Sequence, residues 1–312
     1  MSEAPPERAS MSEAPPERAW PGEAPLRTVA VCGVGLIGGS VAAGLRVRRR
    51  ALDVVGFDPA HAQQALAAGL VDRVAGSLAE AVAGADLVVL AAPVAANCEL
   101  LAELGAGAVP LARRLAPGAA ITDVSSTKRS VTEAARRALG GFGSRFVASH
   151  PIAGSERHGP SAARADLFEG SVALVCPQDG SDADAVARVQ ALWQGLGARC
   201  ATMAPELHDD LFAAVSHWPH AVAFALSASV GGSALADDAR RYCGAGLRDT
   251  TRVGASSPEL WAGILLDNRG PSLAAAAAFR AQLDDIEQAL GDGNRERLTE
   301  ALARGARWRR TL

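Results

Sequence analysis

Two patterns of apolar and polar positions divide the chain. From residue 28 to about residue 202, short apolar runs rich in β-branched residues alternate with segments whose apolar positions recur every three to four residues. The first pattern predicts buried strands and the second predicts amphipathic helices. Beyond residue 202 only the helical pattern continues, with breaks near 231–233, 243–246, 255–258, 268–271 and 291–294. The sequence therefore predicts two domains, over 26–202 and 203–312.

The first domain is predicted to be a Rossmann-type, doubly wound α/β domain, followed by an all-α helical domain. Regular alternation of strands and helices implies a mostly parallel sheet with helices on both faces. Ligands in such sheets bind beyond the carboxyl ends of the strands, where three polar segments fall, at 92–94, 123–128 and around His150. Strands are predicted over 28–32, 53–57, 86–92, 119–124, 145–149 and 172–176, and helices up to Leu45 and over 60–69, 97–115 and 128–139.

Residues 1–25 are predicted to be a disordered tail. The segment MSEAPPERA occurs twice, at 1–9 and 11–19, and it is rich in Pro, Glu and Ala, with little that could pack. It lacks the apolar segment of a signal peptide, and no apolar run is expected to reach the roughly 18 residues of a membrane helix. A cytoplasmic location and no contact with membrane are therefore expected.

Charge and cysteine content exclude several classes of protein. A formal net charge of −3 gives no general attraction to nucleic acid or to anionic membranes, so an anionic substrate must be held by a local group of cations. The five cysteines lie far apart and form no CxxC pair. They therefore favour neither a disulfide framework nor a zinc site, and they suit a reducing compartment.

The glycine-rich turn after the first strand predicts a dinucleotide site. The first glycine of such a turn reverses the chain, the second lets the backbone approach the pyrophosphate, and the third lets helix and strand pack closely. Asp58 ends the second strand, where a carboxylate accepts hydrogen bonds from ribose hydroxyls and repels a 2′-phosphate, which favours NAD over NADP. The predicted NAD-binding residues are Gly33, Gly35, Leu36, Ile37, Gly38, Asp58, Ala92, Pro93 and Ser125.

Seven motifs in one order, within about 28–290, resemble the prephenate/arogenate (cyclohexadienyl) dehydrogenase family of tyrosine biosynthesis. The resemblance implies NAD-dependent oxidative decarboxylation of prephenate or arogenate by a homodimer joined through its helical domains. The family usually has glycine at the position of Ser125, which puts the backbone geometry of that turn in question. The motifs are GVGLIGGS, DVSSTK, SHPIAGSERHG, LFEG, ELHD, AVSHWPHAVAFAL and RDTTRVGASSPELW.

The resemblance assigns roles that can be compared with chemical need. The reaction removes the proton of the substrate's 4-hydroxyl as hydride leaves, which requires a neutral imidazole within hydrogen-bond reach. His150 matches that base, and Ser126 matches the serine that binds the same hydroxyl. Arg252 matches the arginine that grips the side-chain carboxylate, with Arg248 assisting it. The remaining expected substrate contacts are His220, His217 and Glu156, the last meeting either a gating arginine or the ammonium of arogenate.

Simpler interpretations stand beside these roles. His150 can cap a strand end, Ser126 can cap a helix, and Trp261 can pack in a core as readily as under the substrate loop. Lys128, the sole lysine, is expected to orient its loop or screen anionic charge, with solvent exposure as the alternative. His208 and His158 are expected to be structural or exposed. His217 and His220 share a helix face, but without a third ligand no metal site is predicted.

Two other functions remain possible from the sequence. A β-hydroxyacid or pyrroline-carboxylate reductase has the same architecture, although β-hydroxyacid enzymes rely on a lysine in the helical domain and this chain has none after Lys128. The second alternative is a non-catalytic NAD-binding sensor. Retention of His150, Ser126 and Arg252 together argues against it. Prephenate is favoured over arogenate as the substrate.

Overall fold

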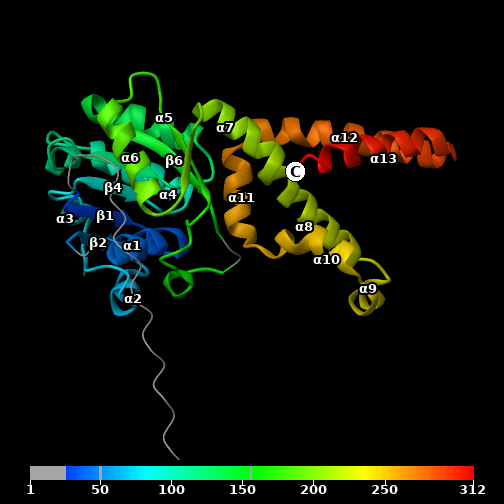
Figure 1. Ribbon diagram of the computed structural model, residues 1–312, viewed down its shortest axis with the longest axis horizontal. Helices are drawn as coiled ribbons and strands as arrows, with labels where there is room; N and C mark the ends of the chain where they lie inside the picture. Colours follow the sequence, from blue (N-terminus) through cyan, green and yellow to red (C-terminus); the bar gives the residue numbers. More distant parts are fainter. Residues whose placement is uncertain (1–25, 49–50, 155–156) are drawn as a thin grey trace, which may run out of the picture.

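A single sheet of eight strands organises the first half of the molecule (Figure 1). The computed structural model describes residues 26–48, 51–154 and 157–312, so the predicted tail at 1–25 and Glu156 lie outside the described residues. The strand order is β3-β2-β1-β4-β5-β6-β7-β8, and every neighbouring pair is parallel except β6 with β7. This order is that of a doubly wound fold, which confirms the predicted fold class. The strands are β1 (Thr28–Cys32), β2 (Asp53–Phe57), β3 (Arg73–Val74), β4 (Leu87–Leu90), β5 (Ala120–Asp123), β6 (Phe146–Ile152), β7 (Val172–Cys176) and β8 (Arg199–Thr202).

Helices cover both faces of this sheet because its central strands are apolar on both sides. In β1, Val29 and Val31 pack in a core with α1 and α6, whereas Ala30 and Cys32 pack in a second core with α3, α4 and α5. The alternation follows from the two-residue period of a strand. The helices of this domain are α1 (Leu36–Arg48), α2 (Ala62–Ala67), α3 (Leu78–Ala81), α4 (Val94–Gly105), η1 (Leu111–Arg114), α5 (Arg129–Ala138), η2 (Gly140–Arg145), η3 (Pro160–Ala162) and α6 (Ala183–Gly195).

The predicted helix over 97–115 is wrong at both ends. Helix α4 begins at Val94, directly after Pro93, and ends at Gly105. Ala106 is extended, Gly107 has a φ of +83°, and the chain resumes only as the short η1 after Pro110. The break follows because Gly107 adopts a left-handed conformation and Pro110 disfavours helical geometry in the residue before it.

The second domain is entirely helical, as predicted, and it is extended. One arm is the antiparallel pair α12 and α13, and the other consists of α8 with the shorter α9 and α10 against its end (Figure 1). The helices are α7 (Pro205–Phe212), the π-helical turn η4 (Ala213–His217), α8 (Trp218–Gly231), α9 (Ala236–Tyr242), α10 (Ala245–Thr251), η5 (Arg252–Ala255), α11 (Pro258–Asp267), α12 (Arg269–Gly291) and α13 (Arg295–Arg309).

One long helical run, from α7 through η4 to α8, links the two domains. Pro219 lacks the N–H that the carbonyl of Val215 would accept in an α-helix, so the chain widens into a π turn just before it. By length and composition alone, Pro205–Gly231 is apolar enough to cross a membrane, so the expectation that no segment reaches that length is wrong. The run nevertheless holds the buried polar residues His208, Asp209 and His217, and one such helix is weak support for a membrane span.

Candidate active site

The glycine-rich turn between β1 and α1 has the geometry that a dinucleotide requires. Gly33 has a φ of +95°, and a Cβ there would lie 2.6 Å from the backbone of Ala91 and Ala92. A Cβ on Gly38 would lie 1.9 Å from the carbonyl oxygen of Gly33, so the third glycine lets the helix pack on its own turn. A Cβ on Gly35 would meet nothing within 4 Å. The open side of Gly35 is therefore the side on which the pyrophosphate of a nucleotide can approach the backbone.

Asp58, at the end of β2, is held by the same turn. Its carboxylate accepts hydrogen bonds from the backbone N–H groups of Val34, at 3.0 Å, and of Ala60 and His61, both at 2.9 Å. Burial raises the pKa of Asp58, but these three donors outweigh it and bring the pKa below its ordinary value. A carboxylate that stays ionised beside the glycine turn suits the expected contact with ribose hydroxyls.

A cavity of about 310 Å³ continues from the glycine turn to the ends of β4 and β5. Ala92, Pro93, Ser125 and Ser126 line it, together with Leu36 and Ile37, so the structure brings the predicted cofactor residues other than Asp58 and the closely packed Gly33 and Gly38 into one cavity. Leu260 and Ile264 of α11 close it from the helical domain. The two strand ends are joined by Asn97, whose amide donates to the Ser125 hydroxyl at 2.9 Å and accepts from the backbone N–H of Ala92 at 3.1 Å.

Ser125 in place of the usual glycine therefore has a local explanation. No non-glycine residue among the described ones has a positive φ, so Ser125 is not strained. Its hydroxyl is one end of the hydrogen-bonded connection between β4 and β5. The connection was not predicted, because Asn97 lies in a helix whose sequence gives no sign of this contact.

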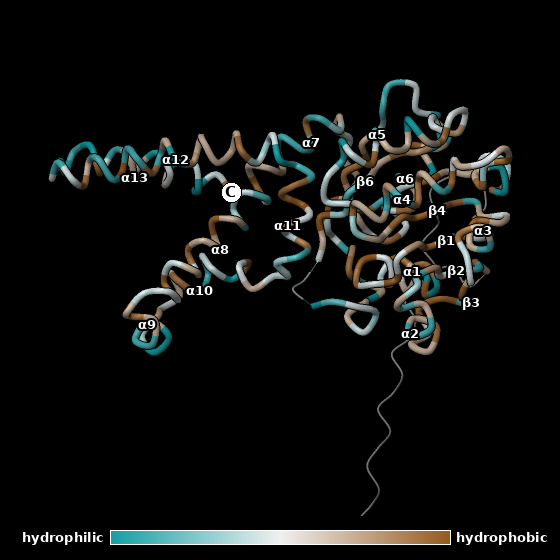
Figure 2. The backbone as a smooth tube through the Cα atoms, turned by 180° about the vertical axis from the view of Figure 1, so that it is seen from behind, coloured by the Kyte–Doolittle hydropathy of each residue, from teal (hydrophilic) through white to brown (hydrophobic). Residues whose placement is uncertain are grey.

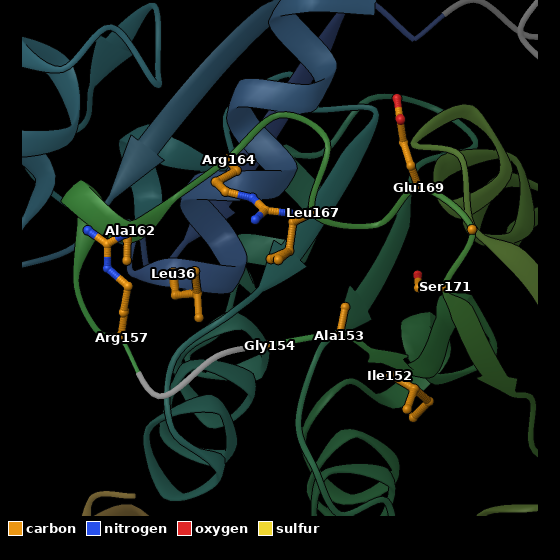
Figure 3. Close-up of a pocket in the computed structure, with 11 residues that line it drawn as sticks. Leu36, Ile152, Ala153, Gly154, Arg157, Ala162, Arg164, Leu167, Glu169 and Ser171 are labelled. Atoms are coloured by element: carbon orange, nitrogen blue, oxygen red, sulfur yellow. The ribbon is translucent and has the colours of Figure 1, made fainter.

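A second cavity, of about 480 Å³, lies on the other side of Leu36 and carries cations. Figure 3 shows Arg157 and Arg164 at the end of the cavity near Leu36, whereas the carboxylate of Glu169 points away from it. Because Leu36 begins α1, these two arginines lie near the helix terminus at which phosphate charge is expected. They were not among the predicted site residues.

Lys128 is fully buried, and so the alternative of solvent exposure is wrong. Its ammonium donates to the Asp123 carboxylate at 2.6 Å and to the backbone carbonyl of Ser149 at 2.7 Å. Asp123 also accepts from the backbone N–H groups of Ser125 and Ser149, at 2.9 and 3.1 Å. The buried ion pair thus fixes the ends of β5 and β6 directly before Ser126 and His150.

His150 lies on β6 at the carboxyl edge of the sheet and is the first member of a hydrogen-bonded series. Its Nδ1 lies 2.9 Å from Nε2 of His208, and Nδ1 of His208 lies 2.8 Å from the Asp209 carboxylate. Asp209 also accepts from the backbone N–H groups of Lys128, at 2.7 Å, and Arg129, at 2.9 Å, where α5 begins. Burial is the main cause that lowers the pKa of His150 well below its ordinary value. His150 is therefore neutral near pH 7, as a base must be.

A row of rings runs from His150 into the helical domain. The His150 ring contacts Phe212, with ring centres 4.9 Å apart, and Phe212 lies 6.3 Å from His217. Trp261 follows at 6.2 Å from His217, and His220 stacks on Trp261 with ring centres 3.6 Å apart. This row crosses the junction between the domains and connects His150 to His217 and His220.

The Nε2 atoms of His217 and His220 have opposite hydrogen-bonding roles. The Asn268 amide donates to the Asp209 carbonyl at 2.7 Å and to Nδ1 of His217 at 3.0 Å, so the proton of neutral His217 is on Nε2. That buried Nε2 makes no close hydrogen bond among the described residues. Burial is the main cause that lowers the pKa of His217 to about 4, and an acceptor in the Ser126 backbone opposes it. His220 donates from Nδ1 to the Ser216 carbonyl at 2.9 Å, which leaves its Nε2 as an acceptor.

The predicted arginines differ in their surroundings. Arg252 begins η5, against α8, and its charge contributes, after burial, to the lowered pKa of His220. Arg248 lies one turn earlier on α10, fully exposed, and its guanidinium meets the thiol of Cys243, which raises the pKa of Arg248. The structure thus places Arg252, but not Arg248, near enough to His220 for its charge to affect the pKa of that histidine. His158 is exposed as expected.

His208 and Asp209 are the main site residues that the sequence did not predict. His208 was expected to be structural or exposed, but it is fully buried and bonded to His150. The motif ELHD contained the signal, although nothing in it indicates which residue the histidine meets. Among the described residues, no group of three or more His, Cys, Asp or Glu side chains could hold a metal ion.

Two family models match most of the chain. The family described as "Prephenate dehydrogenase, nucleotide-binding domain" matches residues 41–202, and that described as "Prephenate dehydrogenase, dimerization domain" matches residues 204–304. The expected Rossmann-type fold of the first part of the chain is therefore confirmed.

Individual relatives match over most of their length. The prephenate dehydrogenase of Bacillus subtilis is 34% identical over 83% of this chain and 69% of its own, and the cyclohexadienyl dehydrogenase of Zymomonas mobilis is 33% identical over 87% and 91%. The structure of Aquifex aeolicus prephenate dehydrogenase with hydroxyphenyl propionate and NAD+ superposes with a TM-score of 0.83 at 31% identity, covering 93% of this chain and 99% of that one. The family resemblance is thus confirmed, and the chain belongs to the prephenate dehydrogenase family.

Proposed function

We propose that this chain is an NAD-dependent dehydrogenase that converts prephenate to 4-hydroxyphenylpyruvate and carbon dioxide in tyrosine biosynthesis. The observation that carries the proposal is a neutral, part-buried His150 at the carboxyl edge of a dinucleotide-binding sheet. Residues 26–202 then bind the cofactor, and residues 203–312 supply the other half of the substrate site. The same architecture would serve a simple carrier of NAD, but such a protein has no need of a buried base.

The residues of the chain account for the proton in this reaction. Nε2 of His150 takes the proton of the 4-hydroxyl while the C4–H electron pair leaves as hydride, which bound NAD accepts. The ring carboxylate then departs as carbon dioxide, and its bonding electrons complete the aromatic ring. His150 returns its proton to the oxygen, now a phenol. No net proton is consumed, so one histidine that is neutral at the outset is sufficient.

The substrate is proposed to lie along the row of rings. The planar guanidinium of Arg252 suits a bidentate contact with the side-chain carboxylate, and His220 presents an acceptor beside it. The Nε2–H of His217 is a buried donor without a close hydrogen bond, and it suits a polar ligand atom. Ser126, at the cofactor cavity, is proposed to bind the 4-hydroxyl together with His150.

Arogenate is the second candidate substrate, since the relative from Zymomonas mobilis is a cyclohexadienyl dehydrogenase. Its ammonium would need an anionic partner in the side-chain pocket. Glu156 is the proposed partner, and Arg157 follows it directly in the chain. Prephenate has no ammonium and needs no such partner, so we propose it as the preferred substrate.

The test is NADH formation by the purified protein with NAD, offered prephenate and arogenate at equal concentrations. Turnover of prephenate is expected, and His150→Asn should lower it by about 10² to 10⁴-fold, the usual contribution of a positioned base. The affinity for NAD should remain the same in both proteins. Binding of NAD without turnover of either substrate would support the sensor function instead.

We also propose that the protein is a cytoplasmic homodimer joined through its helical domain. Helix α8 is apolar around its whole circumference, yet only Ala223 is buried on it (Figure 2). A helix of this kind is normally covered, and a second copy supplies a matching surface. The family description of this segment as a dimerization domain supports the same occupant. The free cysteines among the described residues suit a reducing compartment.

The oligomeric state tests the second proposal. Phe279 and Leu283 lie one turn apart on α12 and are 40% and 41% exposed. Replacing both with glutamate is expected to shift sedimentation from dimer to monomer. Leu66→Glu is the matched control, because Leu66 is 38% exposed on α2 of the other domain. A wild-type protein that sediments as a monomer would contradict the proposal.

A further inference from the structure

The ring of His150 has a second nitrogen whose hydrogen bond decides whether it can act as a base. If Nε2 is to accept a proton, Nδ1 must carry the hydrogen, and so Nδ1 needs an acceptor. Its partner is Nε2 of His208, at 2.9 Å. A histidine nitrogen accepts only if it is unprotonated, so His208 must hold its own hydrogen on Nδ1. That nitrogen faces the Asp209 carboxylate at 2.8 Å.

The Asp209 carboxylate is itself fixed on both of its oxygens. One accepts from the backbone N–H of Lys128 and the other from that of Arg129, in addition to the contact with His208. Burial raises the pKa of Asp209, but hydrogen bonds from His208, Arg129 and Lys128 outweigh it and bring the pKa below its ordinary value. The carboxylate is therefore ionised near neutral pH and orients His208.

We propose that His208 and Asp209 are positioning residues that hold His150 as the Nδ1–H tautomer and stabilise it once it is protonated. The inference deepens the function proposed above and rests on it. When Nε2 takes the substrate proton, the His150–His208 hydrogen bond becomes charge-assisted, and the positive charge is balanced by Asp209. The proton stays on His150 until it returns to the substrate oxygen, so neither helper gains or loses one.

The other charged groups around His150 cannot replace this pair. Lys128, before α5, is bonded to Asp123 of β5, so neither has a free charge. His217 of η4 is turned toward Asn268. Phe212, one turn after His208, contacts the rings of both His150 and His208 and is apolar. Only the His208–Asp209 pair offers Nδ1 of His150 an acceptor with fixed orientation among the described residues.

Three variants test the proposal by turnover. His208→Phe keeps a ring against Phe212 but removes the acceptor, and kcat should fall by roughly 10²-fold while KM and the NAD affinity stay within about twofold. His208→Gln restores a carbonyl acceptor and should recover part of that loss. Asp209→Asn offers one oxygen to N–H donors on both sides, so kcat should fall at least about 10-fold. Wild-type kcat in His208→Phe would overturn the proposal.

Asp210→Asn is the matched control for Asp209→Asn. Asp210 is the next carboxylate on α7, and it pairs with the Arg129 side chain at the surface, where it is 59% exposed. Its kcat should equal that of the wild type. An equal loss in the two variants would mean that any charge change on α7 has this effect, and the specific pairing would be refuted.

The tautomer is also measurable without turnover. Long-range proton–nitrogen NMR of the ¹⁵N-histidine-labelled wild-type protein, with His150→Asn used for assignment, should show His150 and His208 protonated on Nδ1 at neutral pH. An Nε2–H signal for His150 would overturn the inference even if the enzyme is active. If the wild type turns over neither substrate, the proposed function fails, while this signal still decides the hydrogen-bond pattern.

Discussion

The two domains bury polar groups alike but differ in how much of their apolar surface they cover. In the first domain, polar side chains such as Lys128, Asp123 and Ser149 are fully buried and paired, and the strands around them are apolar on both faces. In the second domain, apolar side chains such as Leu266 and Leu290 are 72% and 66% exposed, and the arms lie apart (Figure 1). An exposed apolar surface of this kind is typical of an interaction site, which fits the dimer proposed above.

This difference explains where the site is located. The carboxyl edge of the sheet is rigid, since buried hydrogen bonds fix the ends of β4, β5 and β6. The inner ends of α7, η4 and α11 rest on that edge and bring His208, His217 and Trp261 to it. The proposed base thus lies on the sheet, and the inner end of the extended domain reaches it through His208.

The largest effect on stability is expected when the buried ion pair of the first domain is broken. Lys128→Met leaves the Asp123 charge buried without its cation and should lower the free energy of unfolding by about 3–5 kcal/mol. In the second domain, Arg240→Met removes an exposed pair with Asp237 and should leave that free energy unchanged. Urea unfolding of both variants measures the contrast. Equal losses would show that the domains do not differ in this way.

The second-largest effect is expected on substrate binding, at Arg252 of the second domain. Arg252→Ala should weaken substrate binding by about 2–4 kcal/mol, because a desolvated carboxylate loses its partner. The affinity for NAD should not change. Arg248→Ala, one turn away and directed at the Cys243 thiol, should weaken substrate binding far less, and titration calorimetry can compare the two. Parallel losses would place both arginines at the substrate.

Acid should destabilise the junction between the domains. His150, His208, His217 and His220 all have lowered pKa values in the folded protein, mainly through burial, and that of His217 is about 4. Below about pH 6.5 the unfolded state binds more protons at these histidines, so stability falls on acidification. For His217 the loss is up to ~1.4 kcal/mol per pH unit down to about pH 4. His217→Gln should reduce this slope in urea unfolding measured across that range. An unchanged slope would exclude His217 as a contributor.

The smallest expected effect concerns the cofactor alone. Asp58→Asn keeps an acceptor for the Val34 N–H but removes the charge that repels a 2′-phosphate, so the preference for NAD over NADP should narrow by about 10-fold, or ~1.4 kcal/mol. The ratio of kcat/KM for the two cofactors is the measurement. Retained discrimination would show that another residue distinguishes the ribose.

Sequence patterns predict the interior of the fold better than its edges. The runs 28–32, 53–57 and 172–176 are rich in valine and appear as β1, β2 and β7 with the predicted bounds. Two strands were not predicted. β3 has two residues, too few to show a period, and β8 is a largely exposed strand at the sheet's edge without apolar alternation. Both strands can be recognised only in the structure, from their pairing with neighbouring strands.

The candidate site likewise has a part that the sequence predicts and a part that it does not. His150, Ser126 and the glycines occupy motifs at strand ends, and the structure brings them to one edge of the sheet. The His150–His208 hydrogen bond joins residues 58 positions apart and depends on how α7 lies over β6, which no local pattern encodes. Glu156 lies outside the described residues, so its role stays a prediction.

The continuous run from α7 to α8 has a consequence for how activity depends on concentration. Its first turns hold His208 and Asp209 against His150, and its last turns carry the exposed apolar surface proposed to meet a second copy. Dilution that separates the copies would leave α8 uncovered and loosen the same helix that orients the base. Mass action would then act on catalysis, and the specific activity of the protein would fall at concentrations below the dissociation constant of the dimer.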